Sequence, residues 1–357
     1  MEQASGDDPA EPGRSRPSEG GRRARRVTSI DVARRAGVSA SAVSRAFTEG
    51  AYISRELKAR VMAAARELDY EPNPLARGLI TRRSGMVALL MDELSNPFYP
   101  EALQAFGSEL HRRGKRVMLF APAPGEPLED VLPQALRYSV DGIVVASAHV
   151  TSALAEAARK AAAPVVLFNR MLEHGGLSAV TCDNHAAAEL VARLLAEAGH
   201  RRPAFVAGLE TASTSIHRER GFAAGLHQAG LGAPRRVSGG YTYQGGYAAA
   251  LELCRGGETP DAIFVANDIM ALGVVDALRR ELGLDVPGDV SVVGFDDIPA
   301  ASWPSYDLTT MRQPLRAMVS ETVQLLEDQL ESAYPKATTV TLPGRLIRRG
   351  SARLPPA

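Results

Sequence analysis

The side chains best suited to read another molecule lie in a short stretch at residues 40–47. Its helical spacing turns Val43 and Phe47 toward a core and leaves three polar side chains outward, namely Ser41, Ser44 and Arg45. A guanidinium group can donate two parallel hydrogen bonds to the edge of guanine, which discriminates against other bases by ~1–3 kcal/mol. Ala40 offers a methyl group that can contact the methyl of thymine. This chemistry predicts that the stretch reads base edges in DNA.

The residues around this stretch predict two short helices joined by a tight turn. Thr28 and Asp31 have capping-box spacing, so the hydroxyl accepts from a backbone N–H and the carboxylate suits the positive helix end. Gly37 stands at the helix stop, where a left-handed conformation costs glycine little, and Ser39 can cap the next helix. Helix, glycine turn and helix form the helix-turn-helix pattern, whose second helix enters the major groove. A small helical hairpin in another kind of domain is the alternative.

Charge favours the DNA-binding interpretation. Residues 21–85 contain 14 arginines and lysines against 6 acidic residues, a net charge of +8. The whole chain is neutral, with 41 residues of each sign, so the remainder carries −8. A solvated surface is also charged, but here the positive excess is confined to one segment. A basic segment on an acidic body is typical of a unit that meets phosphate.

A third amphipathic helix, predicted at residues 53–70, is followed by a segment that prolines interrupt. Pro72 ends the helix, Asn73 is a good N-cap, and Pro74 suits a first helical position. The helix that these residues begin is too short to be stable alone in water. We therefore expect it to form against a partner, with an apolar edge that includes Leu79 and can wedge into the minor groove of DNA. An ordinary interdomain linker is the alternative.

After residue 85, apolar strand-like runs alternate with helical stretches. Two such series follow each other, which predicts two α/β subdomains with parallel sheets covered by helices on both faces. The first series has strands at 86–91, 117–120, 142–146 and 165–168 and helices at 99–113, 128–138 and 152–162. The second has strands at 204–207, 262–265 and 290–294 and helices near 185–198, 216–228, 245–253 and 268–281.

Polar side chains follow the strand ends of this body. Ligands of such folds bind near the carboxyl ends of strands or at domain interfaces, where amides, carboxylates and a guanidinium can satisfy several hydroxyls. Arg218 is expected to open a helix, and Tyr241 to lie in a loop where its ring can cover a sugar or base face. Turn formation and helix capping are the alternative roles of such residues. The strand-end residues are Asn96, Phe98, Asn169, Arg170, Asn267, Asp268, Asp296 and Asp297.

A series of motifs extends from residue 27 to residue 351. They are VTSIDVARRAGVSASAVSRAF (27–47), SNPFY (95–99), DGIVVAS (141–147), PVVLFNR (164–170), VTCDN (180–184), RERGF (218–222), FVANDIMALG (264–273), SVVGFDDIP (291–299), LTTMRQP (308–314) and LIRRGS (346–351). Each motif is weak alone, but their order and spacing together are specific. Over nearly the whole chain they resemble the lactose-repressor (LacI/GalR) family of bacterial transcription regulators.

The resemblance implies an N-terminal all-α helix-turn-helix head and an α/β body of two doubly wound parallel-sheet subdomains, similar to periplasmic binding proteins. It also implies a homodimer that binds a palindromic operator in double-stranded DNA. A small-molecule effector, a sugar or a related polyol or nucleoside, would bind between the subdomains. The implied DNA-binding residues are Thr28, Ser39, Ala40, Ser41, Ser44, Arg45, Asn73, Ala76 and Leu79. The implied effector-binding residues are Asn96, Phe98, Asn169, Arg218, Tyr241, Asn267 and Asp296, whereas Asp268 is expected to be a helix cap.

The predicted organisation has five parts. They are a disordered basic tail (1–26), a helix-turn-helix domain (27–72), a hinge helix or linker (73–84), an effector-binding and dimerisation domain (85–351) and a tail (352–357). Two features depart from the family pattern. Ala40 and Ser41 are shorter than the side chains that members often carry there, and Gly78 weakens the hinge helix by roughly 1 kcal/mol.

Other classes of protein fit the sequence less well. Dinucleotide, P-loop, zinc-protease and nucleophile-elbow motifs are missing, so we expect no enzyme, no cofactor and no metal. Cys182 and Cys254 lie far apart without metal-ligand spacing, which indicates a reducing compartment. No apolar run reaches membrane-span length and the N-terminus does not match a signal peptide, so a cytoplasmic protein is expected. A sugar-binding module without transcriptional action is the remaining alternative, and the basic head argues against it.

Overall fold

The computed structural model forms two compact units, Met1–Arg77 and Gly78–Ala357, which we call the head and the body. It describes residues 27–48, 50–71, 83–92, 94–123, 126–147, 150–161, 163–172, 176–255, 258–332 and 336–356. Within these ranges, no helix is long and apolar enough to cross a membrane.

The described part of the head consists of the helices α1 (Ser29–Ala36), α2 (Ala40–Ala46) and α3 (Arg55–Glu67). The predicted capping box is confirmed, because the Asp31 N–H donates to the Thr28 hydroxyl at 3.4 Å and the Thr28 N–H donates to the Asp31 carboxylate at 3.0 Å. Gly37 ends α1 with a φ of 63°, the predicted left-handed stop. The Ser39 hydroxyl caps α2 by accepting from the Ala42 N–H at 3.2 Å. Local hydrogen bonds thus define the helix-turn-helix.

Small apolar side chains from all three helices fill the core of the head, and they are Val32, Ala33, Val43, Ala46, Val61, Ala64 and Ala65. Phe47 was predicted to be a buried residue of α2. It follows the end of α2 instead, partly buried against this core and 5.9 Å from the Tyr70 ring. Helix α3 is shorter than predicted because Ser54 caps its start and Asp69 has a φ of 50° beyond its end.

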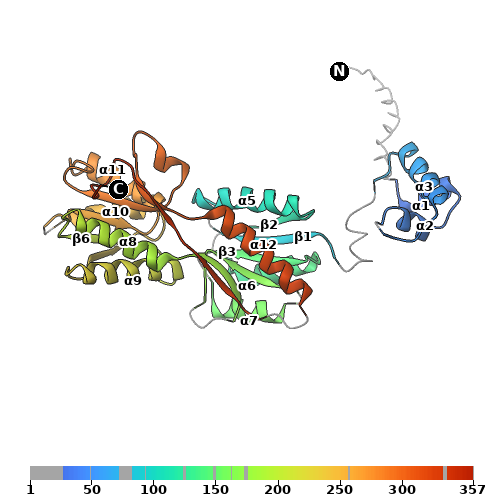
Figure 1. Cartoon of the computed structure of the whole chain (residues 1–357), viewed down its shortest axis with the longest axis horizontal. Helices are drawn as coiled ribbons and strands as arrows, with labels where there is room; N and C mark the ends of the chain where they lie inside the picture. The colour runs from blue at the N-terminus through green and yellow to red at the C-terminus, as the bar shows by residue number, and fades with distance from the viewer. Residues whose placement is uncertain are drawn as a thin grey trace, which may run out of the picture. The chain divides into compact units, whose positions relative to one another are not determined.

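The first subdomain of the body is a parallel sheet with helices on both faces (Figure 1). Its described strands are ordered β11-β5-β4-β3-β1-β2. The two faces bury alternate residues of one strand, since Val87, Leu89 and Met91 pack in one apolar cluster and Ala88 and Leu90 in another. The strands are β1 (Met86–Met91), β2 (Arg116–Phe120), β3 (Gly142–Ala146), β4 (Val165–Phe168), β5 (Ser178–Cys182) and β11 (Thr339–Leu342). Helices α5 (Phe98–Arg112) and α12 (Leu315–Glu331) cover the first face, and α6 (Leu128–Arg137) and α7 (Ser152–Lys160) the second.

The second subdomain repeats this plan with the described strand order β12-β10-β9-β8-β6-β7, in which β12 alone is antiparallel to its neighbour. Helix α8 packs on α9, and α10 on α11 (Figure 1). The strands are β6 (Pro203–Ala207), β7 (Arg235–Ser238), β8 (Ala262–Val265), β9 (Ser291–Asp296), β10 (Thr309–Arg312) and β12 (Arg345–Ile347). The helices are α8 (Asn184–Glu197), α9 (Ser213–Gln228), α10 (Tyr243–Cys254), α11 (Asp268–Arg280) and the 3-10 helix η1 (Pro299–Ser302).

The described chain passes between the subdomains at residues 182–184, 312–315 and 342–345, which we call the first, second and third crossovers. The Asp183 N–H donates to the Leu342 carbonyl at 2.8 Å, so the first and third crossovers lie side by side. Any change in closure between the subdomains must therefore pass through these segments.

The predicted fold, an all-α head and a body of two parallel α/β subdomains, is confirmed. Helix α12 and the strands β5, β7, β10, β11 and β12 were not among the predicted elements. Strands β7, β11 and β12 are short edge strands with partly exposed side chains, so they carry no continuous apolar run that marks a buried strand.

Candidate functional site

The outward face of α2 carries the predicted base-reading side chains. Ala40, Ser41, Ser44 and Arg45 are all exposed. The Nε of Arg45 donates to the Ser41 carbonyl at 3.3 Å, while its two amino groups make no hydrogen bond to any described residue. The Arg45 side chain is thus exposed on this face of α2. Arg45 is the one long, charged side chain among the predicted base-reading residues of α2.

The two predicted hydroxyl contacts of the head, Thr28 and Ser39, are exposed and also act as helix caps. The Thr28 hydroxyl donates to the Asp31 carboxylate at 2.7 Å, and the Ser39 hydroxyl lies 2.9 Å from that of Ser41. Some basic residues of the head hold its fold, since Arg60 donates to the Ala36 carbonyl at 2.7 Å. The predicted hinge contacts Asn73, Ala76 and Leu79 lie outside the described residues.

In the body, one small cavity between the subdomains is lined by all seven predicted effector residues. The lining consists of Asn96, Phe98, Tyr99, Asn169, Arg170, Thr214, Arg218, Tyr241, Asn267 and Asp296. The cavity measures about 10 Å³, which is room for at most one water molecule. The cleft is thus closed upon its own side chains.

The backbone around this cavity adopts conformations that L-residues rarely adopt. Asn169, Tyr241 and Asp296 have φ angles of 58°, 62° and 123°. The Tyr241 ring fits against Gly208, where a Cβ atom would lie 2.2 Å from the ring, so glycine is required there. Strained positions of this kind persist where the surrounding structure fixes them, and they cluster at binding sites.

Direct hydrogen bonds join the two subdomains across the cleft. From the first subdomain, Arg170 donates to the Thr214 hydroxyl of α9 at 2.6 Å, and the Met171 N–H donates to the Ser213 hydroxyl at 3.1 Å. The Thr214 hydroxyl also lies 2.8 Å from the Tyr241 hydroxyl. These contacts join the two subdomains directly across the cleft.

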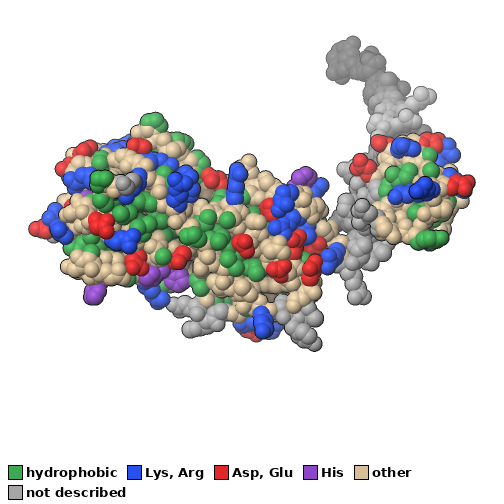
Figure 2. All heavy atoms as spheres, viewed as in Figure 1, with side chains coloured by type: hydrophobic (Ala, Val, Ile, Leu, Met, Phe, Trp, Pro, Cys, Tyr) green, Lys and Arg blue, Asp and Glu red, His purple; other side chains and the backbone are tan. Residues whose placement is uncertain are grey.

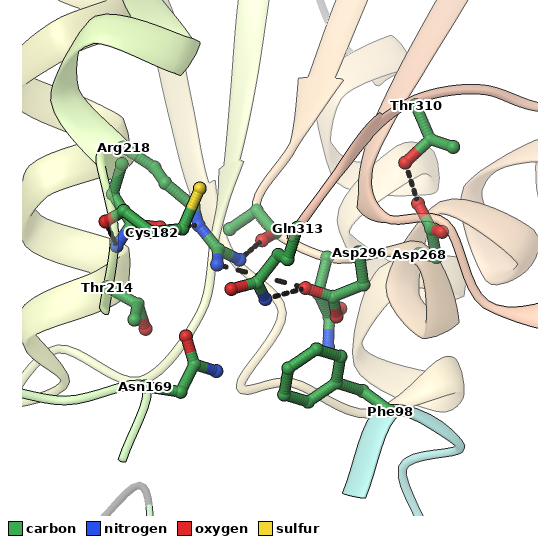
Figure 3. A network of polar contacts seen from close by, with 12 residues as sticks. Phe98, Asn169, Cys182, Thr214, Arg218, Asp268, Asp296, Thr310 and Gln313 are labelled. Carbon is green, nitrogen blue, oxygen red and sulfur yellow. Dashed lines mark hydrogen bonds and ion pairs between the residues drawn. The ribbon is translucent and has the colours of Figure 1, made fainter. Parts of the chain in front are cut away.

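A buried charge network lines the same cleft (Figure 3). The Arg218 guanidinium, 3.5 Å from the centre of the Phe295 ring, points toward Asp296 at 3.8 Å. Gln313 donates to the same Asp296 oxygen at 2.7 Å. Figure 3 shows Phe98 and Asn169 beside this group. Burial raises the pKa of Asp296 to about 6, although Arg218 and the Gln313 hydrogen bond favour its charged form.

Asp268 has a structural position that differs from the predicted helix cap. Asn267 caps α11 instead, because its extended backbone lets the side chain accept from the Met270 N–H at 3.2 Å. The Asp268 carboxylate is fully buried and accepts from the Thr310 hydroxyl at 2.6 Å and from the Ile298 N–H at 2.9 Å. Burial, and next the charge of Asp296, raise the pKa of Asp268 to about 7.

Three buried polar atoms in or beside the cleft have no hydrogen-bond partner among the described residues. They are Asn169 Oδ1, Asn267 Nδ2 and Gln313 Oε1. An unsatisfied buried polar group costs ~1–3 kcal/mol, so a ligand that supplies partners is favoured. Two acceptors and one donor in so small a space suit hydroxyl groups, which both donate and accept.

The sequence missed several residues of this site and misplaced one. Tyr99 and Thr214 line the cavity, and Gln313 touches Asp296, but none of them ends a predicted strand. Tyr99 lies in the motif SNPFY and Gln313 in the motif LTTMRQP, so the family motifs could have identified these two residues as part of the site. Arg218 was predicted to open a helix. It lies in the second turn of α9, because that helix begins at Ser213 rather than Ile216.

A wider groove of about 730 Å³ lies between α5 and the start of α12. It contains none of the predicted effector residues, and its Glu109 and Arg112 are paired with each other at 2.7 Å. The face of the body shown in Figure 2 likewise has positive and negative side chains interspersed. The convergent, buried polar groups therefore favour the small cleft as the ligand site.

Two family models match the chain. Residues 29–73 match the bacterial regulatory proteins of the lacI family, and residues 192–352 match a periplasmic binding protein-like domain. The ribose operon repressor of Escherichia coli (strain K12) is 30% identical over 330 residues, which cover 91% of this chain and 100% of the repressor.

Solved structures show the same similarity. The transcriptional regulator CelR in complex with cellobiose aligns with a TM-score of 0.70 and 30% identity, covering 92% of this chain and 100% of CelR. The lac repressor dimer, bound to operator and the anti-inducer ONPF, aligns with a TM-score of 0.81 and 25% identity, covering 92% of this chain and 99% of the repressor chain.

Proposed function

This chain belongs to the LacI family of bacterial regulatory proteins and is a DNA-binding transcription regulator rather than an enzyme, and we propose that it represses transcription as a homodimer on an inverted-repeat operator. In this proposal a neutral sugar binds the body cleft and controls operator affinity. The protein would act in the cytoplasm, where its DNA is.

The proposed DNA contacts divide into reading and positioning. Arg45 reads guanine through its two outward amino groups, and Ser41 and Ser44 add shorter contacts from the same face. Ala40 contacts a thymine methyl, while Thr28 and Ser39 contact phosphate near the helix starts. Asn73, Ala76 and Leu79 would contact the minor groove. The lac repressor dimer bound to operator supports a dimer with paired heads.

The convergence of Asn96, Asn169, Arg218, Asn267 and Asp296 on one cavity is the observation that carries the effector proposal. Amides, a carboxylate and a guanidinium offer both donors and acceptors to hydroxyl groups. Asn169 Oδ1 and Asn267 Nδ2, which have no hydrogen-bond partner among the described residues, could bond to the hydroxyls of a sugar. The rings of Phe98 and Tyr241 supply apolar faces for the C–H side of a sugar. The relatives agree in class, since CelR was solved with cellobiose and another is a ribose operon repressor.

Sugar binding requires this cleft to change. A cavity of about 10 Å³ cannot hold a sugar ring, so the ligand must displace contacts such as Arg170–Thr214 across the cleft. The ligand then stabilises a second arrangement of the subdomains. The ratio of the sugar affinities of the two arrangements sets the upper limit of the change in operator affinity.

The decisive experiment selects DNA from a random pool with the full-length protein and repeats the affinity measurement at several salt concentrations. We expect enrichment of a short inverted repeat, followed by a change in its affinity when D-ribose or cellobiose is added. Binding that depends on salt but not on sequence would contradict the operator proposal. It would leave the body as a sugar-binding module without transcriptional action.

A further inference from the structure

The cleft arginine is tied directly to the first crossover. The Arg218 side chain is only 2% exposed, and its Nε donates to the Asn184 side-chain oxygen at 2.8 Å. Asn184 is the first residue of α8 and lies where the chain leaves the first subdomain. It does not line the cavity. Arg218 therefore contacts both places: its Nε donates to Asn184 in the first crossover, and its Nη2 points toward Asp296 in the ligand site.

Asn184 completes this link with the other end of its amide. Its nitrogen donates to the Thr181 hydroxyl at 3.1 Å and to the Cys182 carbonyl at 2.9 Å, both in strand β5 of the first subdomain. Its oxygen accepts from Arg218 in helix α9 of the second subdomain. The side chain is 3% exposed, so water does not compete for these bonds. One amide thus joins the ligand wall of one subdomain to a strand of the other.

The neighbouring crossovers are held close to the same group. Gln313, in the second crossover, donates to Asp296, the acid that faces Arg218. In the third crossover, a Cβ atom built on Gly344 would lie 3.2 Å from Cys182 Sγ, so the chain passes directly beside the end of β5. A displacement of Arg218 or Asp296 is therefore expected to move the crossover residues that contact them.

We propose that Asn184 is a positioning residue that couples the ligand cleft to the crossovers by joining Arg218 to strand β5. This inference rests on the proposed effector cleft and adds the route by which occupancy changes subdomain closure. Asparagine suits the role because one side chain supplies both an acceptor for the guanidinium and donors for the strand. A side chain that could only accept would keep the bond to Arg218 and lose those to β5, and a side chain that could only donate would do the reverse.

The first test needs no sugar and uses the full-length protein. Amide hydrogen exchange is measured at residues 179–182 of β5, with strand β3 as an internal reference for global stability. Arg218→Ala should accelerate exchange in β5 relative to β3 by roughly severalfold to a hundredfold, the range for coupled hydrogen-bonded neighbours. In an Asn184→Ala background the same Arg218→Ala change should add nothing further. Independent, additive effects of the two substitutions would overturn the proposal.

Two control variants and one conservative variant accompany this cycle. Arg193→Ala removes an exposed arginine of α8 that lies 3.8 Å from Glu197 on the same helix, and Asp183→Asn keeps a good cap at the start of α8. Neither should accelerate exchange in β5. Asn184→Asp keeps the acceptor for Arg218 but loses the donors to β5. It should therefore loosen the strand as Asn184→Ala does, and it serves if the alanine variant does not fold.

The second test measures coupling, with D-ribose and cellobiose as probes on the selected operator. The sugar that raises the melting temperature of the wild-type protein should still raise that of Asn184→Ala, because Asn184 does not line the cavity. Its effect on operator affinity should fall at least severalfold in the variant. An undiminished effect would overturn the coupling role. If neither sugar affects the wild-type protein, the sugar proposal fails for these probes, and the exchange cycle alone decides the role of Asn184.

Discussion

The recognition surface of the head and the cleft of the body use similar polar groups in opposite ways. On α2, Arg45 and its neighbours are exposed, and the amino groups of Arg45 bond to no described residue. In the cleft, Arg218 and Asp296 are 2% and 9% exposed and are engaged with each other and with Gln313. We therefore expect DNA to meet side chains that are already exposed, whereas a ligand of the cleft must replace internal contacts. In the proposed function, the head surface recognises DNA and the cleft changes its contacts when a ligand binds.

The largest effect is expected from Arg45→Ala, which removes the main reading group of the exposed surface. Loss of one bidentate pair in each half-site should weaken specific operator binding by ~2–6 kcal/mol, or roughly 30-fold to 20,000-fold. Binding to the selected operator and to random DNA would be measured side by side. The dimer should stay intact. Arg66→Ala, which removes an exposed arginine of α3, is the control and should weaken both kinds of binding alike. Unchanged operator affinity in Arg45→Ala would exclude α2 as the recognition helix.

Arg218→Ala should abolish the sugar response while the protein still binds operator. Couplings between two sites are typically ~1–3 kcal/mol, so a response of roughly 5- to 150-fold should disappear. Operator affinity with and without the active sugar measures this directly. Arg193→Ala, which removes an exposed arginine of α8, should respond as the wild-type protein does. A normal response in Arg218→Ala would remove this residue from the site.

The buried acids of the body predict an unusual dependence of stability on pH. Asp268 and Asp296 have pKa values raised to about 7 and about 6, so between the unfolded and folded pKa values the native state binds protons that the unfolded state has released. Their contribution to stability is therefore full below about pH 4 and is lost as pH rises toward about 7.

Asp268→Asn tests this dependence, because the amide keeps the size of the side chain and does not titrate. The free energy of unfolding of the wild-type body should fall by on the order of a few kcal/mol from about pH 5 to about pH 8, and less steeply in the variant. Chemical denaturation at several pH values provides the measurement. Parallel curves for the two proteins would show that Asp268 is not the titrating group.

The smallest effect on stability and operator affinity is expected from Asp141, which binds the start of the described body at Ser84 and Gly85. The Asp141 carboxylate accepts from the Ser84 N–H at 2.6 Å, from the Ser84 hydroxyl at 3.0 Å and from the Gly85 N–H at 3.0 Å. Asp141→Asn keeps one acceptor and should cost about 1 kcal/mol of body stability. Operator affinity should fall modestly while the sugar still binds. Loss of sugar binding would mean instead that the substitution disturbs the whole subdomain.

Local rules predicted the head better than the cleft. The Thr28–Asp31 box and the Gly37 stop were read from spacing alone, because a cap involves residues three or four positions apart. In the body, apolar runs located most of the central strands and the edge strand β2, but β5, β10, the other edge strands and α12 were missed. The seven effector residues were named from strand ends and family resemblance, and they converge on one cavity. Their contacts with ligand are still a prediction.

The sequence by itself determined the features that depend on residues close together in the chain. These are the helix caps, the helix faces, the charge of the head and the alternation of strands and helices. Only the tertiary structure decided that Asn96 and Asp296 share a cavity, that Thr214 bonds to Arg170, and that Asn184 joins Arg218 to β5. The physical reason is that a cap depends on a few neighbouring bonds. The cleft, in contrast, depends on how two sheets and three crossovers pack, and no short stretch of sequence contains that arrangement.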